Sequence, residues 1–469
     1  MEYRFSEEKF IESFNAKTDD IKSVDSIRLT HNSDLQFKLF PYKASGKTPI
    51  VYELEDVVSG FFRETASKKT EPIVFEELCD DLLEEVDVDE NDIDYFKDMV
   101  QSFFFRGNEF IADNLGLYPY QTATNNKSAD NLAHFIFSVM DIDESDCQRI
   151  EKAKEQYQFN VLENMVIKTI ENKKVSEAEV KPVYFKVKTD IQELFKKDFS
   201  FMLESGMASL EDFSNLFAIY YFYYVSQTSI ILDQFCQGRR DSNVKLYYAL
   251  DWEKVSKNRM CCIEGWEKLQ ENLNHMFSHA ITLEIINQTQ TQTDRMIDYI
   301  ALGELAKNSS LDLIIAEEIE KAEAVYCSYI GDYKGFDSIP YSQGGTKTGI
   351  AVNHLFRCVF QQFMNTGRKR ANQFYNEKFI EFCKSRWVKN RKKSGLVLNL
   401  TERDIIFMTK ICIRDKEKIR LNDLYKEYEK RGIYLDGTSK GYLQEFFTKL
   451  NLIDKKSDSG DAQYVKRIL

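Results

Sequence analysis

The fold prediction starts from Thr401–Leu469, which reads TERDIIFMTKICIRDKEKIRLNDLYKEYEKRGIYLDGTSKGYLQEFFTKLNLIDKKSDSGDAQYVKRIL. Thr401 can cap a helix over residues 402–413, because a threonine hydroxyl accepts a hydrogen bond from an unpaired N–H group of the first helical turn. A charged turn then leads into the extended residues 419–421. A second helix is predicted over residues 423–431, ahead of a glycine that favours a helix end.

A third helix is predicted from Thr438 or Ser439 through Leu450, and residues 452–469 then read as two short strands around a turn at residues 458–461. The order helix, short strand, helix, helix, hairpin is that of a winged helix-turn-helix module. A small apolar core would close it. Its predicted members are Leu424, Tyr428, Leu443, Phe446, Phe447, Leu450, Leu452, Ile453, Tyr464 and Val465.

The rest of the chain predicts a mainly α fold with a multi-helical body. The 469 residues contain only 6 prolines and 19 glycines, and apolar residues recur three and four apart over most of the chain after Val51. The opening 50 residues are mixed, and LQFKLFPY (residues 35–42) suggests a short strand or extended segment. The expected divisions are a mixed N-terminal segment (1–50), an acidic helical body (51–349), a long basic helix or connector (350–394) and a winged-helix domain (395–469).

Residues 213–232, FSNLFAIYYFYYVSQTSIIL, are about as long as a bilayer span and carry no charge. Their centre is rich in tyrosine, Ser226–Ser229 follows, and no basic flank orients them. A buried central helix is therefore the prediction, with no membrane association. Nine cysteines without a C-x-x-C pair, and a start without a secretory signal, favour free thiols in a cytoplasmic protein.

Charge is divided unevenly along the chain. The whole chain carries a formal charge of −13, but from Asn365 to the end 25 Lys and Arg face 14 Asp and Glu. That segment is therefore at +11, and the preceding 364 residues are at −24. A basic end attracts a phosphate backbone whereas an acidic body repels it, so the two parts are expected to have different partners.

The first group of candidate DNA-binding residues lies in the basic connector. If residues 350–393 form one helix, its cations recur over several turns and cannot share one face. A solvated helix end and docking onto an acidic partner are the alternatives to nucleic-acid contact. The candidates are Arg368, Lys369, Arg370, Lys389, Arg391, Lys392 and Lys393.

The second group lies in the predicted winged helix, whose third helix would enter the major groove with its early residues. The candidates are Ser439, Lys440, Tyr442 and Gln444 on that helix and Lys455, Lys456, Lys466 and Arg467 on the hairpin. The third helix offers no arginine for bidentate guanine contacts, so phosphate contacts without strong sequence specificity are expected. Winged helices also dock proteins, which is the alternative for this module.

Three other patterns suggest ligand sites. Gly344–Gly349 places two glycines, Lys347 and hydroxyls before a predicted helix, a possible anion contact, although a flexible connector is the simpler interpretation. His275 and His279 have a spacing that can chelate zinc, but no third ligand is evident nearby in the sequence, so no metal is predicted. Residues 41–48 imitate a P-loop but begin with proline, which has no amide proton. No catalytic constellation and no cofactor are predicted.

Three stretches of the C-terminal part resemble one known family. They are GLVLNLTERDIIFMTKICI, KIRLNDLYKEYEKRGIYLDGTSKGYLQEF and LNLIDKKSDSGDAQYVKRIL, all within residues 395–469. They resemble the end of the DptG family, a component of bacterial DNA-phosphorothioation-dependent restriction systems. The resemblance implies partner subunits similar to DptF and DptH, which resemble P-loop ATPases, and it carries no catalytic residues.

We therefore expect a non-catalytic, DNA-associated cytoplasmic subunit of a defence complex that links ATPase partners to DNA. One alternative is a protein-interaction scaffold whose winged helix binds a partner rather than DNA. A cryptic nuclease is the other.

Overall fold

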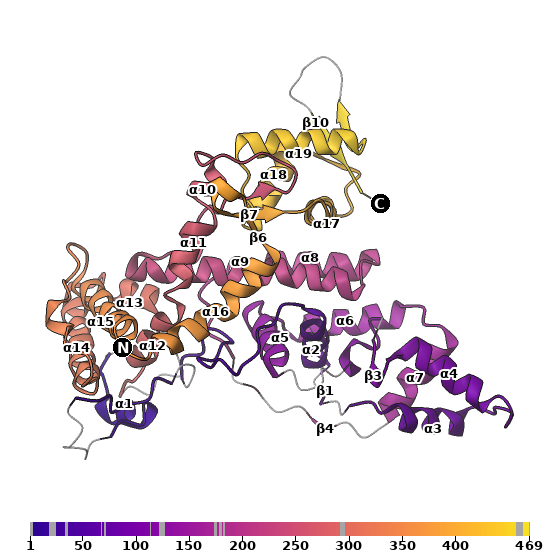
Figure 1. Cartoon of the computed structure of the whole chain (residues 1–469), viewed down its shortest axis with the longest axis horizontal. Coiled ribbons are helices and arrows are strands. Elements are labelled where there is room, and N and C mark those ends of the chain that lie inside the picture. Colours follow the sequence, from indigo (N-terminus) through magenta and orange to yellow (C-terminus); the bar gives the residue numbers. More distant parts are fainter. Residues whose placement is uncertain are drawn as a thin grey trace.

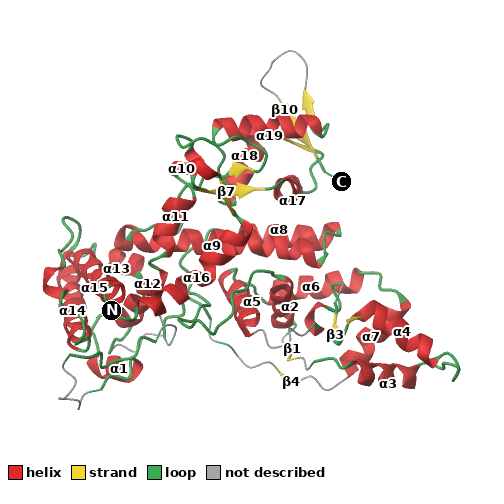
Figure 2. Cartoon of the chain, viewed as in Figure 1, coloured by secondary structure: helices red, strands yellow, loops and turns green. Residues whose placement is uncertain are grey.

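The computed structural model of the chain is mainly helical, as its periodicity predicts (Figures 1 and 2). Most of its buried hydrophobic side chains belong to one connected cluster that extends from Tyr3 to Val465. The structure describes residues 3–17, 25–32, 36–66, 68–69, 72–112, 114–121, 127–172, 176–177, 181, 183–290, 296–455 and 463–468.

The centre of the molecule is α9 (Leu210–Asp233), which Ser209 caps by accepting a hydrogen bond from the Asp212 N–H group. Every residue from Phe213 to Leu232 except Asn215 is buried, which confirms the predicted central helix. Within the described residues, no helix combines the length and the apolar character that crossing a bilayer requires.

Phenylalanine side chains join α9 to α2 (Glu55–Thr65) and α8 (Gln192–Ser205). Ring centroids lie 4.7 Å apart between Phe61 and Phe217 and 5.1 Å apart between Phe62 and Phe213. Such aromatic pairs add about 0.5–1.5 kcal/mol each beyond the area they bury. This layer explains the high aromatic content.

A first group of helices lies on one side of α9, at the right of Figure 1. Two short antiparallel strand pairs accompany it, β1 with β4 and β2 with β3. Its elements are β1 (Lys68–Lys69), α3 (Phe75–Glu85), α4 (Ile93–Phe104), β2 (Phe105–Arg106), β3 (Glu109–Phe110), η2 (Tyr118–Tyr120), α5 (Lys127–Val139), α6 (Glu144–Gln156), α7 (Val161–Asn172) and β4 (Ser176–Glu177).

A second group lies around the opposite end of α9, together with the N-terminal segment and its helix α1 (Glu7–Ser13). Residues 36–42 form no strand. Instead, the backbone N–H groups of Gln36 and Phe37 donate to the buried carboxylate of Glu284. The elements of this group are η3 (Phe235–Gln237), α11 (Trp266–Leu273), α12 (Met276–Ile286), α13 (Tyr299–Leu305), α14 (Ser309–Ser328), η4 (Phe336–Ser338), α15 (Lys347–Met364) and α16 (Lys369–Arg386). The short helix α10 (Met260–Ile263) lies instead in the upper part of Figure 1, where Cys261 packs against Val397.

Residues 350–394, expected as a long basic helix or connector, do not form one continuous helix. The helix α15 ends at Met364 and α16 begins at Lys369, with Thr366 and Gly367 in the turn between them. The chain then leaves helix altogether, because residues 388–390 form a strand, β6.

Beyond α16 the chain builds a small mixed sheet before it reaches the C-terminal residues. Its strand order is β5-β7-β6, formed by β5 (Ala249–Leu250), β6 (Val388–Asn390) and β7 (Leu396–Leu400), with η5 (Lys392–Ser394) between the last two. The strand β7 is parallel to β5 and antiparallel to β6. Residues 396–400, expected within the winged helix, therefore pair with the body.

The C-terminal unit, as we call residues 401–468, follows the predicted order of elements. Thr401 and Asp404 form a reciprocal cap at the start of α17, as the threonine position suggests. The last sheet has the antiparallel order β8-β10-β9. This content is compatible with a winged helix. The elements are α17 (Glu402–Ile413), β8 (Lys418–Arg420), α18 (Leu421–Lys430), α19 (Gly437–Lys449), β9 (Ile453–Lys455) and β10 (Gln463–Lys466).

Candidate nucleic-acid interface

A buried ion cluster fastens the C-terminal unit to the body. Asp198, on α8, faces the guanidinium groups of Arg431 and Arg414, with an N–O distance of 2.7 Å to each. The Tyr220 hydroxyl of α9 donates to the other carboxylate oxygen at 2.6 Å. Asp198 and Arg431 are both buried. Since isolated buried charges are costly, this arrangement holds the unit in one position as long as the partners stay together.

A second contact covers the beginning of α19. Arg259 donates from Nε and Nη2 to the two carboxylate oxygens of Asp436, both at 2.7 Å, and its Nη2 lies 2.9 Å from the Ser439 hydroxyl. The same hydroxyl donates to the carboxylate of Glu253 at 3.0 Å. Asp436, not Thr438 or Ser439, caps the helix.

Ser439 was predicted to contact DNA, and this prediction does not fit the structure. The residue is buried, and its hydroxyl is shared between groups of the body. Ser439 cannot reach a base edge while the unit is docked. The sequence could not reveal this contact, since Ser439 is 180 residues from Arg259.

The other candidates on α19 are half-buried. The Lys440 ammonium lies 4.8 Å from the centroid of the Tyr425 ring and 3.4 Å from the Glu429 carboxylate. Tyr442 and Gln444 are each partly exposed. The exposed side of α19 includes Glu445, whose charge would repel a phosphate backbone, so the surface of this helix is less basic than its candidate residues alone suggest.

The outer face of the β8-β10-β9 sheet is more basic. Tyr464 lies opposite Arg420, and Lys466 opposite Lys418, so these side chains share one face, whereas Val465 and Ile419 face the core. The Lys418 ammonium and the Arg420 guanidinium lie 5.3 and 5.9 Å from the centroid of the Tyr464 ring. We call Lys418, Arg420, Tyr464 and Lys466 the basic sheet face.

Only Lys466 of this face was a candidate from the sequence, together with the neighbouring Arg467, and both residues are exposed. Tyr464 was expected in the core, and Lys418 and Arg420 were not assigned. The alternation of charged and apolar residues along 418–420 was the signal that could have identified them. The Lys455 side chain, Lys456 and the turn at 458–461 lie outside what the structure describes.

The basic connector does not form one cationic surface. Arg368 is held by both carboxylate oxygens of Asp332, at 2.7 and 2.9 Å, and Lys389 pairs with Asp251. Arg391 donates to the Leu250 carbonyl at 2.7 Å and to the Asn399 side chain at 2.6 Å. Arg368 and Arg391 are therefore engaged within the fold and poorly available to DNA, whereas Lys389 is exposed and its contact with DNA stays a prediction.

The remaining connector cations are exposed but lie apart. Lys369 and Arg370 open α16. Lys369 borders a hollow of about 590 Å³ together with the acidic Glu271 and Glu377. Lys392 and Lys393 lie in η5, after β6. In Figure 1 the start of α16 and β10 belong to different parts of the molecule.

Backbone N–H groups of the Gly344–Gly349 loop already donate to a carboxylate of the same chain. The N–H groups of Lys347 and Thr348 donate to the carboxylate of Asp312 at 3.0 and 2.8 Å, and the Gly349 N–H group donates to the Thr346 hydroxyl. These are the amides that a phosphate would use at this helix start. Lys347 is therefore not placed in an open anion cradle.

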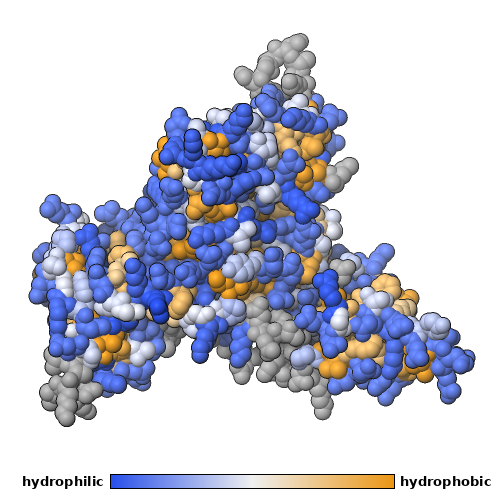
Figure 3. All heavy atoms as spheres, in the orientation of Figure 1, coloured by the Kyte–Doolittle hydropathy of each residue, from blue (hydrophilic) through white to orange (hydrophobic). Residues whose placement is uncertain are grey.

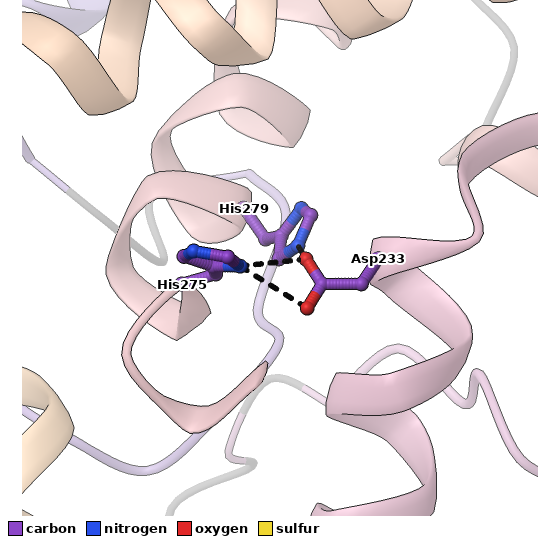
Figure 4. A group of neighbouring side chains, drawn as sticks. All are labelled: Asp233, His275 and His279. Atoms are coloured by element: carbon purple, nitrogen blue, oxygen red, sulfur yellow. Dashed lines mark hydrogen bonds and ion pairs between the residues drawn. The ribbon is translucent and has the colours of Figure 1, made fainter. Parts of the chain in front are cut away.

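His275 and His279 have a third polar neighbour that their spacing in the sequence did not indicate. The carboxylate of Asp233, at the end of α9, lies between His275 and His279 (Figure 4). Its distance in sequence, 42 residues from His275, explains why spacing alone did not find it.

No family model matches the chain, and no curated protein matches it significantly.

Proposed function

We propose that this chain is a non-catalytic, DNA-associated subunit of a phosphorothioation-dependent restriction complex in the cytoplasm. Its C-terminal unit would bind the DNA backbone, and its acidic helical body would hold ATPase partners similar to DptF and DptH. The family is suggested by the resemblance of residues 395–469. The contact with DNA is supported by the basic sheet face.

The observation that carries the proposal is the grouping of Lys418, Arg420 and Lys466 around the ring of Tyr464. Asp454 pairs with Lys418 at 2.6 Å, and Asp423, which acts on Arg420, is itself paired with Lys426 at 2.9 Å, so carboxylates offset these cations only in part. Cations of this kind contact phosphates without reading sequence. The docked position of Ser439 favours contact through the sheet rather than through the start of α19.

An equilibrium titration with the full chain tests this. Fluorescence anisotropy of a labelled duplex is measured over a series of salt concentrations for the wild type and for a Lys418→Glu/Arg420→Glu/Lys466→Glu variant. The wild-type affinity should fall steeply with salt. On a plot of the logarithm of the binding constant against the logarithm of salt concentration, the slope for the variant should be shallower by about 0.9 for each phosphate contact removed.

The matched control reverses three exposed lysines of the body, Lys152 on α6, Lys168 on α7 and Lys307 in the turn between α13 and α14. Because its change in net charge is identical, it separates a local contact from a general electrostatic effect. Equal losses in the two variants would contradict the assignment to the basic sheet face.

A feature of α4 supports a partner-binding role for the body. Tyr95, Met99 and Phe103 are spaced four apart along this helix and are 75%, 37% and 65% exposed. Apolar side chains are visible on the surface of the lobe that contains α3, α4 and α7 (Figure 3). Exposed apolar side chains on one helix face are typical of a protein contact.

A second candidate is a scaffold whose C-terminal unit contacts only protein. The observation in its favour is that Arg259 and Glu253 of the body cover the start of α19, so this end of the helix is not free to enter a DNA groove. Co-purification of the basic-face variant with its partners distinguishes the two. The scaffold predicts that the variant loses partner capture and that its duplex affinity is no different from that of the wild type, whereas the DNA-associated subunit predicts a loss of duplex affinity with partner capture kept.

A further inference from the structure

Three side chains of metal-ligand type, one from α9 and two from the start of α12, converge at the C-terminal end of α9. Asp233 is the last residue of that helix, His275 immediately precedes α12, and His279 is in its first turn. One ligand atom of each residue lies within 4.8 Å of those of the other two. Figure 4 shows both imidazole rings directed at the carboxylate.

The distances between these atoms are short. His275 Nδ1 is 2.9 Å from Asp233 Oδ1, and His279 Nε2 is 2.8 Å from the same oxygen. The histidines are four residues apart, so the helical turn places them on one side of α12. The backbone hydrogen bond from the His279 N–H group to the His275 carbonyl, 2.9 Å, fixes that turn.

The groups behind the ligands orient them as a metal site requires. His279 is buried, its Nδ1 lies 3.2 Å from the Tyr299 hydroxyl, and its ring stacks on Phe356 with centroids 4.3 Å apart. The Asn272 amide donates to the other oxygen of Asp233. Partners of this kind set the histidine tautomer and hold the carboxylate in metal sites.

The group is also accessible. Asp233 borders a hollow of about 520 Å³ whose other wall includes Gly344–Thr346, and His275 borders the 590 Å³ hollow beside α16. An ion can enter from either side, and water can complete its coordination, as in zinc sites with three protein ligands.

We propose that Asp233, His275 and His279 bind one divalent transition-metal ion, with Zn²⁺ as the fitting ion for two imidazoles and a carboxylate. The ion would join one oxygen of Asp233, Nδ1 of His275 and Nε2 of His279. This inference does not depend on the proposed DNA contact, and it assigns no reaction to the ion.

A second group, Glu323, His354 and Cys358, has the same closeness of ligand atoms and provides the control. There, Nε2 of His354 faces the Ile339 carbonyl at 3.1 Å, and His354 and Cys358 are both buried. In the Asp233 group only His279 is buried, and its other two members border hollows, so it is the more accessible of the two groups.

The full chain, stripped with chelator and dialysed, is titrated with Zn²⁺ by isothermal calorimetry, and its metal content is measured by mass spectrometry. We expect one strongly bound ion per wild-type chain. His275→Ala should weaken binding by at least about 100-fold, beyond the 10–100-fold typical of losing an outer partner. His354→Ala should bind as the wild type does.

Thermal unfolding shows whether a variant that fails to bind zinc has lost a ligand or has failed to fold. Zn²⁺ should raise the Tm of the wild type and of His354→Ala but leave the Tm of His275→Ala unchanged, and circular dichroism checks that each variant is helical. His275→Gln serves as a second variant, since His275 is part-exposed and its exchange disturbs packing little. A wild type that binds no zinc, or binding lost in His354→Ala rather than in the His275 variants, would overturn the proposal.

Discussion

Asp198 and Arg431 form a two-pronged ion pair, with Nε–Oδ2 and Nη2–Oδ1 distances of 2.7 Å, although 233 residues separate them in sequence. Both side chains are buried, at 0% and 1% relative exposure. Arg431 ends the second helix of the C-terminal unit, and Asp198 belongs to the body. The position of the unit relative to the body therefore depends on charges hidden from water.

Removal of the Asp198 charge should destabilise the protein strongly. In Asp198→Asn the guanidinium groups of Arg431 and Arg414 lose their shared carboxylate, and breaking a buried pair costs about 3–5 kcal/mol. Denaturant unfolding followed by circular dichroism measures the change. Asp241→Asn, which breaks the exposed pair with Arg239, is the control and should leave the free energy of unfolding nearly unchanged.

Ser439 should behave as a docking residue rather than a DNA contact. Ser439→Ala removes the hydroxyl that joins Arg259 to Glu253, and the loss of such a buried hydrogen bond costs about 1–3 kcal/mol. The unfolding midpoint should fall, while the duplex affinity and its salt slope stay at wild-type values. A weaker duplex affinity of Ser439→Ala with unchanged stability would instead support direct contact of Ser439 with DNA.

Acid should destabilise the protein partly through His31. Burial, assisted by the nearby Arg368 charge, lowers the pKa of His31 to about 3, against a usual value of about 6.5. Between these values only the unfolded chain takes up the proton, so the stability contributed by the neutral ring is complete above about pH 6.5 and is lost as pH falls towards 3.

At about pH 4.5 the expected loss is on the order of 2–3 kcal/mol relative to pH 7. In His31→Gln, whose amide can still meet the Tyr326 hydroxyl, the unfolding free energy should change less steeply over this range. Parallel pH profiles for wild type and variant would show that His31 is not the group responsible.

The exposed apolar side chains of α4, Tyr95, Met99 and Phe103, should contribute to partner binding and not to folding. Tyr95→Ser/Phe103→Ser replaces two exposed side chains, so the unfolding free energy should change by no more than about 0.5 kcal/mol. Capture of the ATPase partners in a tagged co-purification should fall. The exposed Val161, on α7, provides a matched apolar control as Val161→Ser. Undiminished capture by the double variant would exclude this face as the contact.

The sequence by itself determined the local elements, because their signals lie within a few residues. The apolar spacing of residues 213–232 and their lack of charge predicted a buried central helix, which α9 is. Thr401 predicted the cap of α17, three residues from the N–H group that it satisfies. The helix–strand–helix–helix–hairpin order at the C-terminus was readable for the same reason.

Only the tertiary structure decided what the polar side chains do. Arg368, Arg391 and Ser439 resemble DNA contacts in the sequence, but their partners are carboxylates and carbonyls as far as 186 residues away. Asp233 joins His275 and His279 only because the end of α9 meets the start of α12. Charge and hydrogen-bonding capacity are encoded locally, whereas the group that uses them is chosen by packing between distant segments.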